Sequence, residues 1–373
     1  MNSQPRTVRR IKASLSGTNL ELTGDYNQRL VYQAIRTKGP ITRNALIELT
    51  GLAKPTIAGI VRRLLGSDLV HETDRIYGGR GQPAVHLEIN PQGCYAIGLL
   101  VGDDALELVS IDASGTVVQR LSTASSPSSG EQATAVFRTF FEDARLLYRD
   151  RIIGLGVVRT GHGLPVVSGE HGIDLSALAA IASGVPIYSD SDLSAATAGE
   201  SLFGAGGTFQ SYYYILMGSS PVGGLVVNQA LFKGAHPGKM RRLFPGAEPA
   251  WCREMVAAAT SMRRDGQAAV DCDQTWVAAA CADLLPLLTS INCMLNPGGI
   301  ILGGQFPQQW LDVLATRCNA LLLERAPHIP SHAGIQPSRL AADAALIGAA
   351  SLPMRARLYP IEEALLKAPD RAG

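Results

Sequence analysis

The chain has 373 residues, of which 46% are hydrophobic and 17% are charged, and its formal net charge is +1. This composition describes an ordinary folded protein, and the length is sufficient for two or three domains with separate cores. Because no apolar run reaches about 18 residues and the basic N-terminus lacks an apolar signal region, we expect neither a membrane span nor secretion.

The six cysteines are scattered along the chain, and no two of them form a C-x-x-C pair. This usage suits a reducing compartment and provides no disulfide framework. We therefore expect a cytoplasmic protein.

The small net charge conceals an uneven distribution. Residues 1–90 contain 13 Lys or Arg and 7 Asp or Glu, a net charge of +6, whereas the remaining residues contain 20 basic and 25 acidic side chains, a net charge of −5. A basic N-terminal part on an acidic body suggests a module that binds a polyanion such as nucleic acid.

Three short helices are predicted in the basic part. In residues 25–39 one helical stripe is apolar (Leu30, Val31, Ala34, Ile35), and the pattern stops at Gly39 and Pro40. A second helix begins after the N-cap candidate Thr42, buries Ala45, Leu46 and Leu49, and ends at a turn on Gly51. The third helix follows, with Ile57, Ile60, Val61 and Leu64 on its core side and Pro55 in its first turn.

A strand, a glycine-rich tip "GGRGQP" and a second strand with alternating Val85, Leu87 and Ile89 come next. Three helices followed by a two-stranded hairpin is the layout of a winged helix-turn-helix, whose second turn helix lies in the DNA major groove. The alternative is a small helical domain that docks another protein through residues 26–90.

The outer face of the third helix is small at its start and basic at its end. Pro55, Thr56, Ala58 and Gly59 form a low surface that lets the backbone approach base edges, while Lys54, Arg62 and Arg63 can reach phosphates. Arg80 between glycines suits a narrow minor groove. The predicted DNA-binding residues are Arg43, Lys54, Pro55, Thr56, Ala58, Gly59, Arg62, Arg63, Arg80 and Gln82.

Residues 91–355 alternate between strands and helices and contain many glycines. Each half begins with a glycine-bearing β-hairpin, which suggests two similar α/β lobes around a cleft for a small ligand. The expected organisation is a basic arm (1–25), a winged helix-turn-helix (26–90), a first α/β lobe (91–205), a second α/β lobe with a C-terminal helix (206–355) and a tail (356–373).

The ordered set of motifs resembles the ROK family (repressors, open reading frames and kinases), in particular its members with an N-terminal winged helix. The motifs are "GPITRNALIELTGLAKPTIAGIVRRLL", "GGRGQP", "SDLSAATAGE", a glycine hairpin from Gly218, "NPGGIILGG" and "ALIGAA". The resemblance implies an actin-like, sugar-kinase-type fold. It also implies a repressor of operator DNA that responds to a carbohydrate-related molecule, and we expect a homodimer or a dimer of dimers.

The loops that hold phosphates in kinases of this family are altered here. The first loop, roughly Asp-x-Gly-Gly-Thr in the kinases, corresponds to Leu100, Val101, Gly102, Asp103 and Asp104, and these new carboxylates oppose phosphate. The second loop reads Gly218-Ser219-Ser220-Pro221-Val222, in which proline removes an N–H donor. We therefore expect no enzyme activity and no cofactor, although Asp192 still occupies the position of the catalytic base. A carbohydrate kinase with an appended domain is the alternative.

The resemblance also implies where zinc and the effector would bind. Only Cys252 and Glu254 remain of the family's zinc motif, and Phe244 stands at its histidine position, so we expect no metal. The resemblance places the effector against Arg159, Gly161, His162, Ser191, Asp192 and Arg241. The arginines predict a negatively charged effector. Two alternatives stay open: a solvated, degenerate pocket, and a regulator that senses a protein partner.

Overall fold

The computed structural model describes residues 20–76, 84–102, 105–123, 130–160, 174–234, 242–244, 247–264, 272–325 and 332–360. The chain forms two compact units. The first comprises Met1–Leu64, Glu72–Glu88 and Leu358–Gly373, and the second comprises Leu65–His71 and Ile89–Arg357. The chain therefore returns to the first unit after completing the second.

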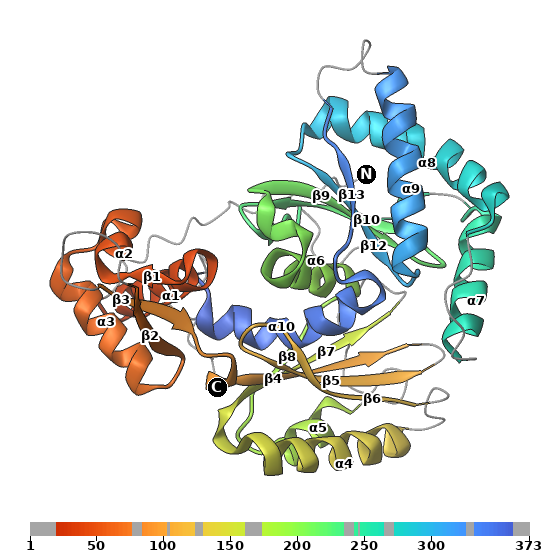
Figure 1. The fold of residues 1–373 in the computed structure, drawn as a ribbon. Coiled ribbons are helices and arrows are strands. Elements are labelled where there is room, and N and C mark those ends of the chain that lie inside the picture. Colours follow the sequence, from red (N-terminus) through yellow and green to blue (C-terminus); the bar gives the residue numbers. More distant parts are fainter. Residues whose placement is uncertain are drawn as a thin grey trace, which may run out of the picture. The chain divides into compact units, whose positions relative to one another are not determined.

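The first unit contains helices α1 (Leu20–Lys38), α2 (Arg43–Thr50) and α3 (Lys54–Gly66). A small sheet in the order β1-β3-β2 accompanies them (Figure 1), with strands β1 (Ile41–Thr42), β2 (Val70–Ile76) and β3 (Ala84–Ile89). Strand β1 pairs antiparallel with β3, and Ile41 lies opposite Leu87. The three helices and the two longer strands follow one another in the order that the sequence predicts.

Local sequence explains both ends of α2. The Thr42 hydroxyl accepts a hydrogen bond from the Ala45 amide at 3.2 Å, which confirms Thr42 as the N-cap. Gly51 has a left-handed backbone with φ of 70°, and its N–H donates to the Ile47 carbonyl at 2.9 Å. The prediction that Leu49 is buried is wrong, because this residue is 52% exposed. Leu46 is the one fully buried residue of this two-turn helix, and Ala45, which was also predicted to be buried, is half-buried.

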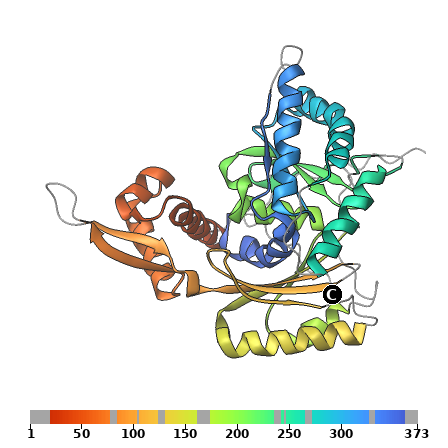
Figure 2. The same ribbon diagram turned by 45° about the vertical axis from the view of Figure 1, so that its right-hand side comes forward.

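The first lobe of the second unit is a five-stranded sheet in the order β6-β5-β4-β7-β8. Its strands are β4 (Tyr95–Val101), β5 (Leu106–Asp112), β6 (Val117–Ser122), β7 (Ile152–Arg159) and β8 (Ile187–Ser189). Helices α4 (Gly130–Tyr148) and α5 (Leu175–Ile181) cover one face, and α10 (Ala344–Leu358) covers the other (Figures 1 and 2). The phenylalanines of α4 fill the core on the first face.

The second lobe has a sheet in the order β11-β10-β9-β12-β13. Its strands are β9 (Ser211–Met217), β10 (Val222–Val227), β11 (Ala230–Leu231), β12 (Ile300–Gly304) and β13 (Ile335–Pro337). Helices α7 (Ala250–Arg264), α8 (Gln274–Leu295) and α9 (Gln308–Arg325) lie on one side and α6 (Asp192–Phe203) on the other (Figure 2). Strands β9 and β10 form the glycine-bearing hairpin expected from the sequence.

Helix α8 is the one described helix that is long and apolar enough to cross a membrane by length and composition alone. Its residues Val277, Leu284 and Leu288 are buried in the core of the second lobe, together with Trp310 and Leu314 of α9. Packing within the second lobe therefore accounts for the apolar character of α8.

Helix α10 lies in direct backbone contact with β7 and α6, because a glycine stands at each crossing. A Cβ atom placed on Gly156 of β7 would lie 1.8 Å from the Ala349 carbonyl oxygen of α10. A Cβ atom on Gly348 would lie 2.0 Å from the Ala195 carbonyl oxygen of α6. Glycine is therefore required at both crossings, since any side chain would separate the backbones.

Candidate functional site

A cavity of about 600 Å³ lies between the two lobes of the second unit. Its walls come from β4–β6, the start of α6, the β9–β10 loop, α7, the end of β12 and the start of α10. The polar residues of these walls are Glu107, Arg120, Ser122, Thr123, Thr160, Asp192, Ser219, Ser220, Thr260, Gln305 and Asp343. Among the described wall residues, seven hydroxyl or amide side chains and four charged groups thus face one space of the size that small ligands occupy.

Asp192 is the residue of this cavity that the sequence predicts. It begins α6 and is 4% exposed. Ser191, the N-cap of α6, accepts a hydrogen bond from the Ser194 amide at 3.2 Å, and Asp190 accepts one from the Ser194 hydroxyl at 2.7 Å. These caps fix the first turn of the helix and thereby the place of the Asp192 carboxylate.

The other predicted effector residues divide into two groups. Ser191 directly precedes Asp192 in the chain. Arg159 is the last residue of β7 and does not line the cavity, whereas the next residue, Thr160, does. Gly161, His162 and Arg241 lie outside the described residues. Of the predicted effector residues, the structure therefore brings Asp192 to the cavity wall, with Ser191 directly before it in the chain, and the full set stays a prediction.

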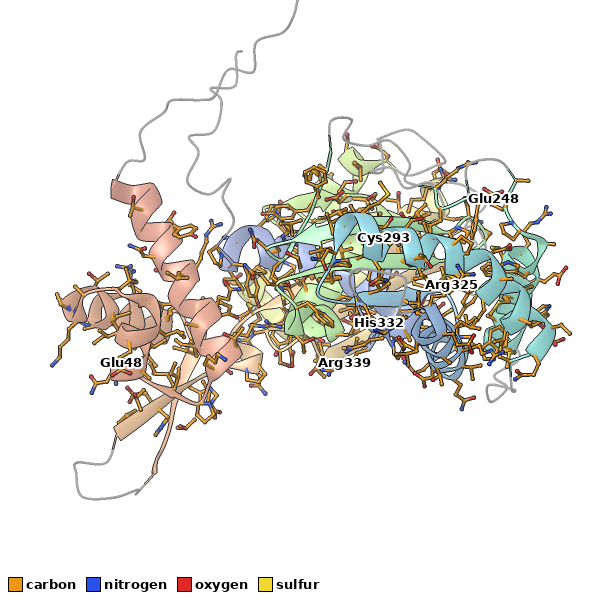
Figure 3. All side chains as sticks on the ribbon, turned by 90° about the horizontal axis from the view of Figure 1, so that it is seen from above. Glu48, Glu248, Cys293, Arg325, His332 and Arg339 are labelled. Carbon is orange, nitrogen blue, oxygen red and sulfur yellow. The ribbon has the colours of Figure 1, made fainter. Side chains whose placement is uncertain are left out.

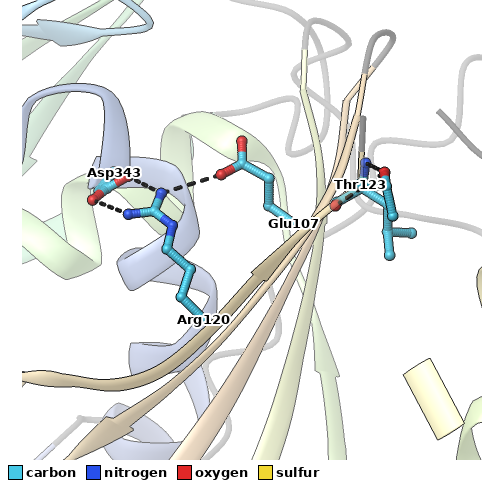
Figure 4. A network of polar contacts seen from close by, with 5 residues as sticks. Glu107, Arg120, Thr123 and Asp343 are labelled. Atoms are coloured by element: carbon cyan, nitrogen blue, oxygen red, sulfur yellow. Dashed lines mark hydrogen bonds and ion pairs between the residues drawn. The ribbon is translucent and has the colours of Figure 1, made fainter. Parts of the chain in front are cut away.

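An ionic network that the sequence does not predict lies inside the cavity (Figure 4). Arg120 of β6 donates from Nη1 to Asp343 Oδ2 at 2.9 Å and from Nη2 to Asp343 Oδ1 at 2.5 Å. Arg120 Nη2 also donates to Glu107 Oε2 of β5 at 3.2 Å. The hydrogen bonds to Asp343 are the main reason that the pKa of Arg120 is raised above its usual value.

A weak signal for this network exists in the sequence. Glu107 lies between two leucines near the start of β5, and Asp343 stands among alanines directly before α10. A charged residue in such a setting is usually paired when it is part-buried. The identity of the partner could not be predicted, because Arg120 and Asp343 are 223 positions apart.

The second loop, between β9 and β10, is bonded to a further carboxylate, that of Glu248, which Figure 3 labels. The Ser220 hydroxyl donates to Glu248 Oε1 at 2.9 Å, and Arg242 lies 3.5 Å from the same oxygen. In the first loop, the buried side chain of Leu100 lines the cavity where the kinases of the family have aspartate. An apolar side chain and a carboxylate thus adjoin the two loops that the family resemblance aligns with the phosphate-binding loops of the kinases.

No group of three or more metal-ligating side chains gathers among the residues that the structure describes. Cys252 is buried in α7, and burial raises the pKa of its thiol to about 12. Glu254 accepts a hydrogen bond from the Trp276 indole at 3.0 Å. Cys252 is thus part of the core of the second lobe, and Glu254 is bonded to a tryptophan at the surface.

The second predicted site is the outer face of α3. Lys54, Pro55, Thr56, Ala58, Arg62 and Arg63 are all exposed there, whereas Ile57, Ile60, Val61 and Leu64 are at most 2% exposed. A Cβ atom on Gly59 would meet nothing within 4 Å. The face therefore combines small residues with basic ones over a fully buried stripe, as predicted.

Two basic residues near this face are already engaged. Arg63 Nε donates to Gln28 Oε1 at 2.8 Å, and Arg43 at the start of α2 pairs with Glu72 at 2.6 Å. Arg80 and Gln82 lie outside the described residues. Arg62 is thus the arginine of α3 for which no protein partner is observed in the described residues.

Comparisons with known proteins show what the chain is similar to. It is 26% identical over 218 residues to the xylose repressor of Bacillus subtilis, a match that covers 56% of this chain and 57% of the relative. It is 29% identical over 192 residues to the DNA-binding transcriptional repressor Mlc of Escherichia coli, covering 48% of this chain and 47% of Mlc. The chain therefore matches only about half the length of these curated relatives. No protein-family model matches it.

Solved structures agree in fold. The crystal structure of a ROK family transcriptional regulator, described as a homologue of E. coli Mlc, covers 92% of this chain and 99% of its own with a TM-score of 0.61 at 20% identity. The chain resembles the ROK-family repressors. A ROK family protein from Streptococcus pneumoniae, solved in complex with sucrose, covers 70% of this chain and 98% of its own with a TM-score of 0.51 at 19% identity. The two-lobed unit thus has the ROK fold.

Proposed function

We propose that this chain is a sequence-specific transcriptional repressor. Residues 26–90 act as a winged helix-turn-helix on operator DNA, and the two-lobed unit binds a carbohydrate-related effector without acting as an enzyme. The protein works in the cytoplasm as a homodimer or a dimer of dimers. The observation that carries the proposal is the exposed outer face of α3, which is small at its start and basic at its end.

The composition of this face favours DNA over a protein partner. The cores of protein–protein interfaces are rich in aromatic and other large apolar groups and poor in charge. On α3 every large apolar side chain before the last turn is buried in the first unit. A low backbone at Gly59 with Lys54 and Arg62 beside it suits a groove bordered by phosphates.

The cavity supports a sensor for a small polar molecule. Hydroxyl and amide groups from both lobes can exchange hydrogen bonds with sugar hydroxyls, and Asp192 can accept further ones. The described walls favour an uncharged or cationic effector over the anionic one expected from the sequence. Arg120, the arginine among the described wall residues, is already bound by Asp343 and Glu107.

One observation favours the alternative of a carbohydrate kinase, namely that Asp192 lines the cavity at the position of the catalytic base. Base catalysis alone does not transfer phosphate, because the metal ion and the backbone amides supply most of the stabilisation. Here Leu100 replaces the metal-side carboxylate, and Glu248 lies against the second loop. We therefore propose that Asp192 binds an effector hydroxyl.

DNA binding is tested by selecting sequences from genomic fragments with the full chain and measuring their affinity by fluorescence anisotropy. We expect enrichment of a palindrome whose half-sites are one or more helical turns apart. Replacing Lys54 and Arg62 together by alanine should weaken binding without unfolding the first unit. Selection of no sequence by the folded protein would refute the proposal.

The sensor is tested by calorimetry with xylose, N-acetylglucosamine and sucrose, with glucosamine as a cationic sugar and gluconate as an anionic one. Binding of a neutral or cationic sugar that Asp192→Asn weakens would support the proposed site. Tight binding of gluconate alone would instead support the anionic effector. In parallel, ATP-dependent phosphorylation of any of these sugars at the rate of a working kinase would show that the chain is an enzyme.

A further inference from the structure

One helix of the second unit begins at the cavity and ends where the chain re-enters the first unit. Ala341, Ala342, Asp343 and Ala345 line the cavity, and α10 starts at Ala344. The second unit extends to Arg357, and Leu358, the last residue of α10, already belongs to the first unit. The helix therefore connects the two units covalently, in addition to the places within α3, β2 and β3 at which the chain passes between them.

The cavity end of this connection is set by an ion pair. Asp343 directly precedes α10 and binds the fork of Arg120 through both carboxylate oxygens. Figure 4 shows the Arg120 fork pointing at Asp343, with Glu107 approaching from the other side. A ligand that competes for Arg120 or Asp343 therefore acts on the residue directly before α10.

The body of α10 is packed too tightly to absorb a displacement within itself. All residues from Ala344 to Met354 are buried. The helix backbone contacts Gly156 of β7 without any intervening side chain, and Gly348 of α10 contacts α6 in the same way. Close-packed elements of this kind move as units, because they have few voids into which a local change could relax.

The far end of the connection is a tyrosine buried in the first unit. Tyr359 follows α10 directly and is 4% exposed. Its ring lies edge-on to Tyr32 of α1, with 5.8 Å between ring centroids and 78° between planes. The Arg36 guanidinium carbon lies 5.5 Å from the centroid of the Tyr359 ring. Helix α1 in turn packs against α2.

We propose that α10 transmits the state of the cavity to the first unit, and that Tyr359 is the positioning residue through which it acts on α1. This inference rests on the proposed function only in so far as the transmitted state controls DNA binding. A change at Asp343 shifts the start of α10, the helix carries the shift along its length, and Tyr359 applies it to Tyr32 and Arg36. The result is a change in how firmly α1 is held.

The test perturbs the cavity end and measures the far end. Hydrogen exchange of the full chain is followed by mass spectrometry in peptides that cover Val31–Ile35 of α1. Asp343→Asn weakens the pair with Arg120 at the start of α10. Glu107→Gln is the matched control, because it weakens the pair of the same arginine with a strand that does not lead into α10.

We expect Asp343→Asn to change the exchange rates of these α1 amides by about threefold or more, because exchange reports local opening of the helix, and Glu107→Gln to leave them within experimental error. Tyr359→Phe keeps the ring and should preserve the response to Asp343→Asn. Tyr359→Ala removes the ring and should abolish that response. Equal effects of Asp343→Asn and Glu107→Gln on α1, or an effect of neither, would overturn the proposal.

If Tyr359→Ala unfolds the first unit, the comparison of Asp343→Asn with Glu107→Gln in the otherwise unchanged chain still tests the transmission.

Two results separate this inference from the proposed function. If α1 responds as expected but the chain selects no DNA sequence, the transmission stands and the proposed function fails. If operator affinity is measurable and Asp343→Asn leaves both it and α1 unchanged, the transmission fails and the repressor proposal stands.

Discussion

Replacing Gly59 by alanine separates the stability of α3 from its proposed contact with DNA. Gly59 lies in the interior of this helix on its outer face, and a Cβ atom there would meet nothing within 4 Å. The added methyl group therefore costs no packing within the protein. A glycine at such a position is unfavourable for the helix itself, so a reason for it has to be sought outside the folded chain.

The structure gives the expected effect of Gly59→Ala on the stability of the first unit and on its affinity for DNA. Alanine is preferred over glycine in a helix interior by about 0.5–1 kcal/mol, so Gly59→Ala should stabilise the first unit by about that amount. For a unit of this size the melting temperature should rise by roughly 4 °C. If the α3 backbone approaches base edges at Gly59, the methyl group should cost about 1–3 kcal/mol of binding, comparable to one base contact. The dissociation constant should then rise about tenfold or more.

The assay pairs calorimetric unfolding with anisotropy on a selected DNA site. Gly24→Ala is the matched control, because Gly24 lies in α1 and a Cβ atom there would also meet nothing within 4 Å. Gly24→Ala should raise stability without changing DNA affinity. If Gly59→Ala stabilises the protein and binds every selected site as tightly as the unaltered chain, then the outer face of α3 does not approach the bases, and the docking argument is refuted.

Three further predictions address other parts of the molecule. Arg62→Ala should weaken binding to all DNA sequences by a similar factor and lower the salt slope by about 1 in anisotropy titrations, whereas Arg80→Ala should weaken A·T-rich sites most; sequence-specific loss with Arg62→Ala would contradict this. Gly156→Ala forces a methyl group onto the Ala349 carbonyl and should cost about 2–3 kcal/mol in urea unfolding, and an unchanged midpoint would show that α10 can move away. Among the six cysteines only Cys293 is exposed (Figure 3), so one thiol should react rapidly with Ellman's reagent near pH 8 and the others only after denaturation.

Elements with a regular local pattern could be predicted from the sequence. The stripe of Ile57, Ile60, Val61 and Leu64 defined both faces of α3, because helical spacing alone decides which side chains share a side. The cap at Thr42 and the turn at Gly51 followed from backbone chemistry at single positions. Leu49 shows the limit of such reasoning. It belongs to the apolar pattern of α2 but is exposed, because the surface that a two-turn helix buries is smaller than its apolar face.

The charge of the cavity could not be predicted, because it depends on pairs that are far apart in the sequence. The prediction of an anionic effector depends on arginines that lie close to the family's effector positions along the chain. Among the described wall residues the arginine is Arg120, whose charge is taken up by Asp343 and Glu107. Arg241 lies outside the described residues, so the contact of an anionic effector with it stays a prediction. The family resemblance identifies Asp192 because its motif is a short continuous stretch at the start of α6. A local motif says nothing about which strand faces η6 (Ala341–Asp343) across the cavity.

The same ion pair sets an upper limit on the regulation that α10 can transmit. A ligand shifts an equilibrium only by the difference in its interaction with the two states. The Arg120 and Asp343 side chains are 41% and 34% exposed, so breaking their pair is worth about 1 kcal/mol at most. In a dimer that binds a palindrome both protomers contribute, which gives about 2 kcal/mol or a roughly 30-fold change in operator affinity. A repressor of this kind would be tuned over one to two orders of magnitude. A much steeper response to effector would require further contacts that differ between the two states of the cavity.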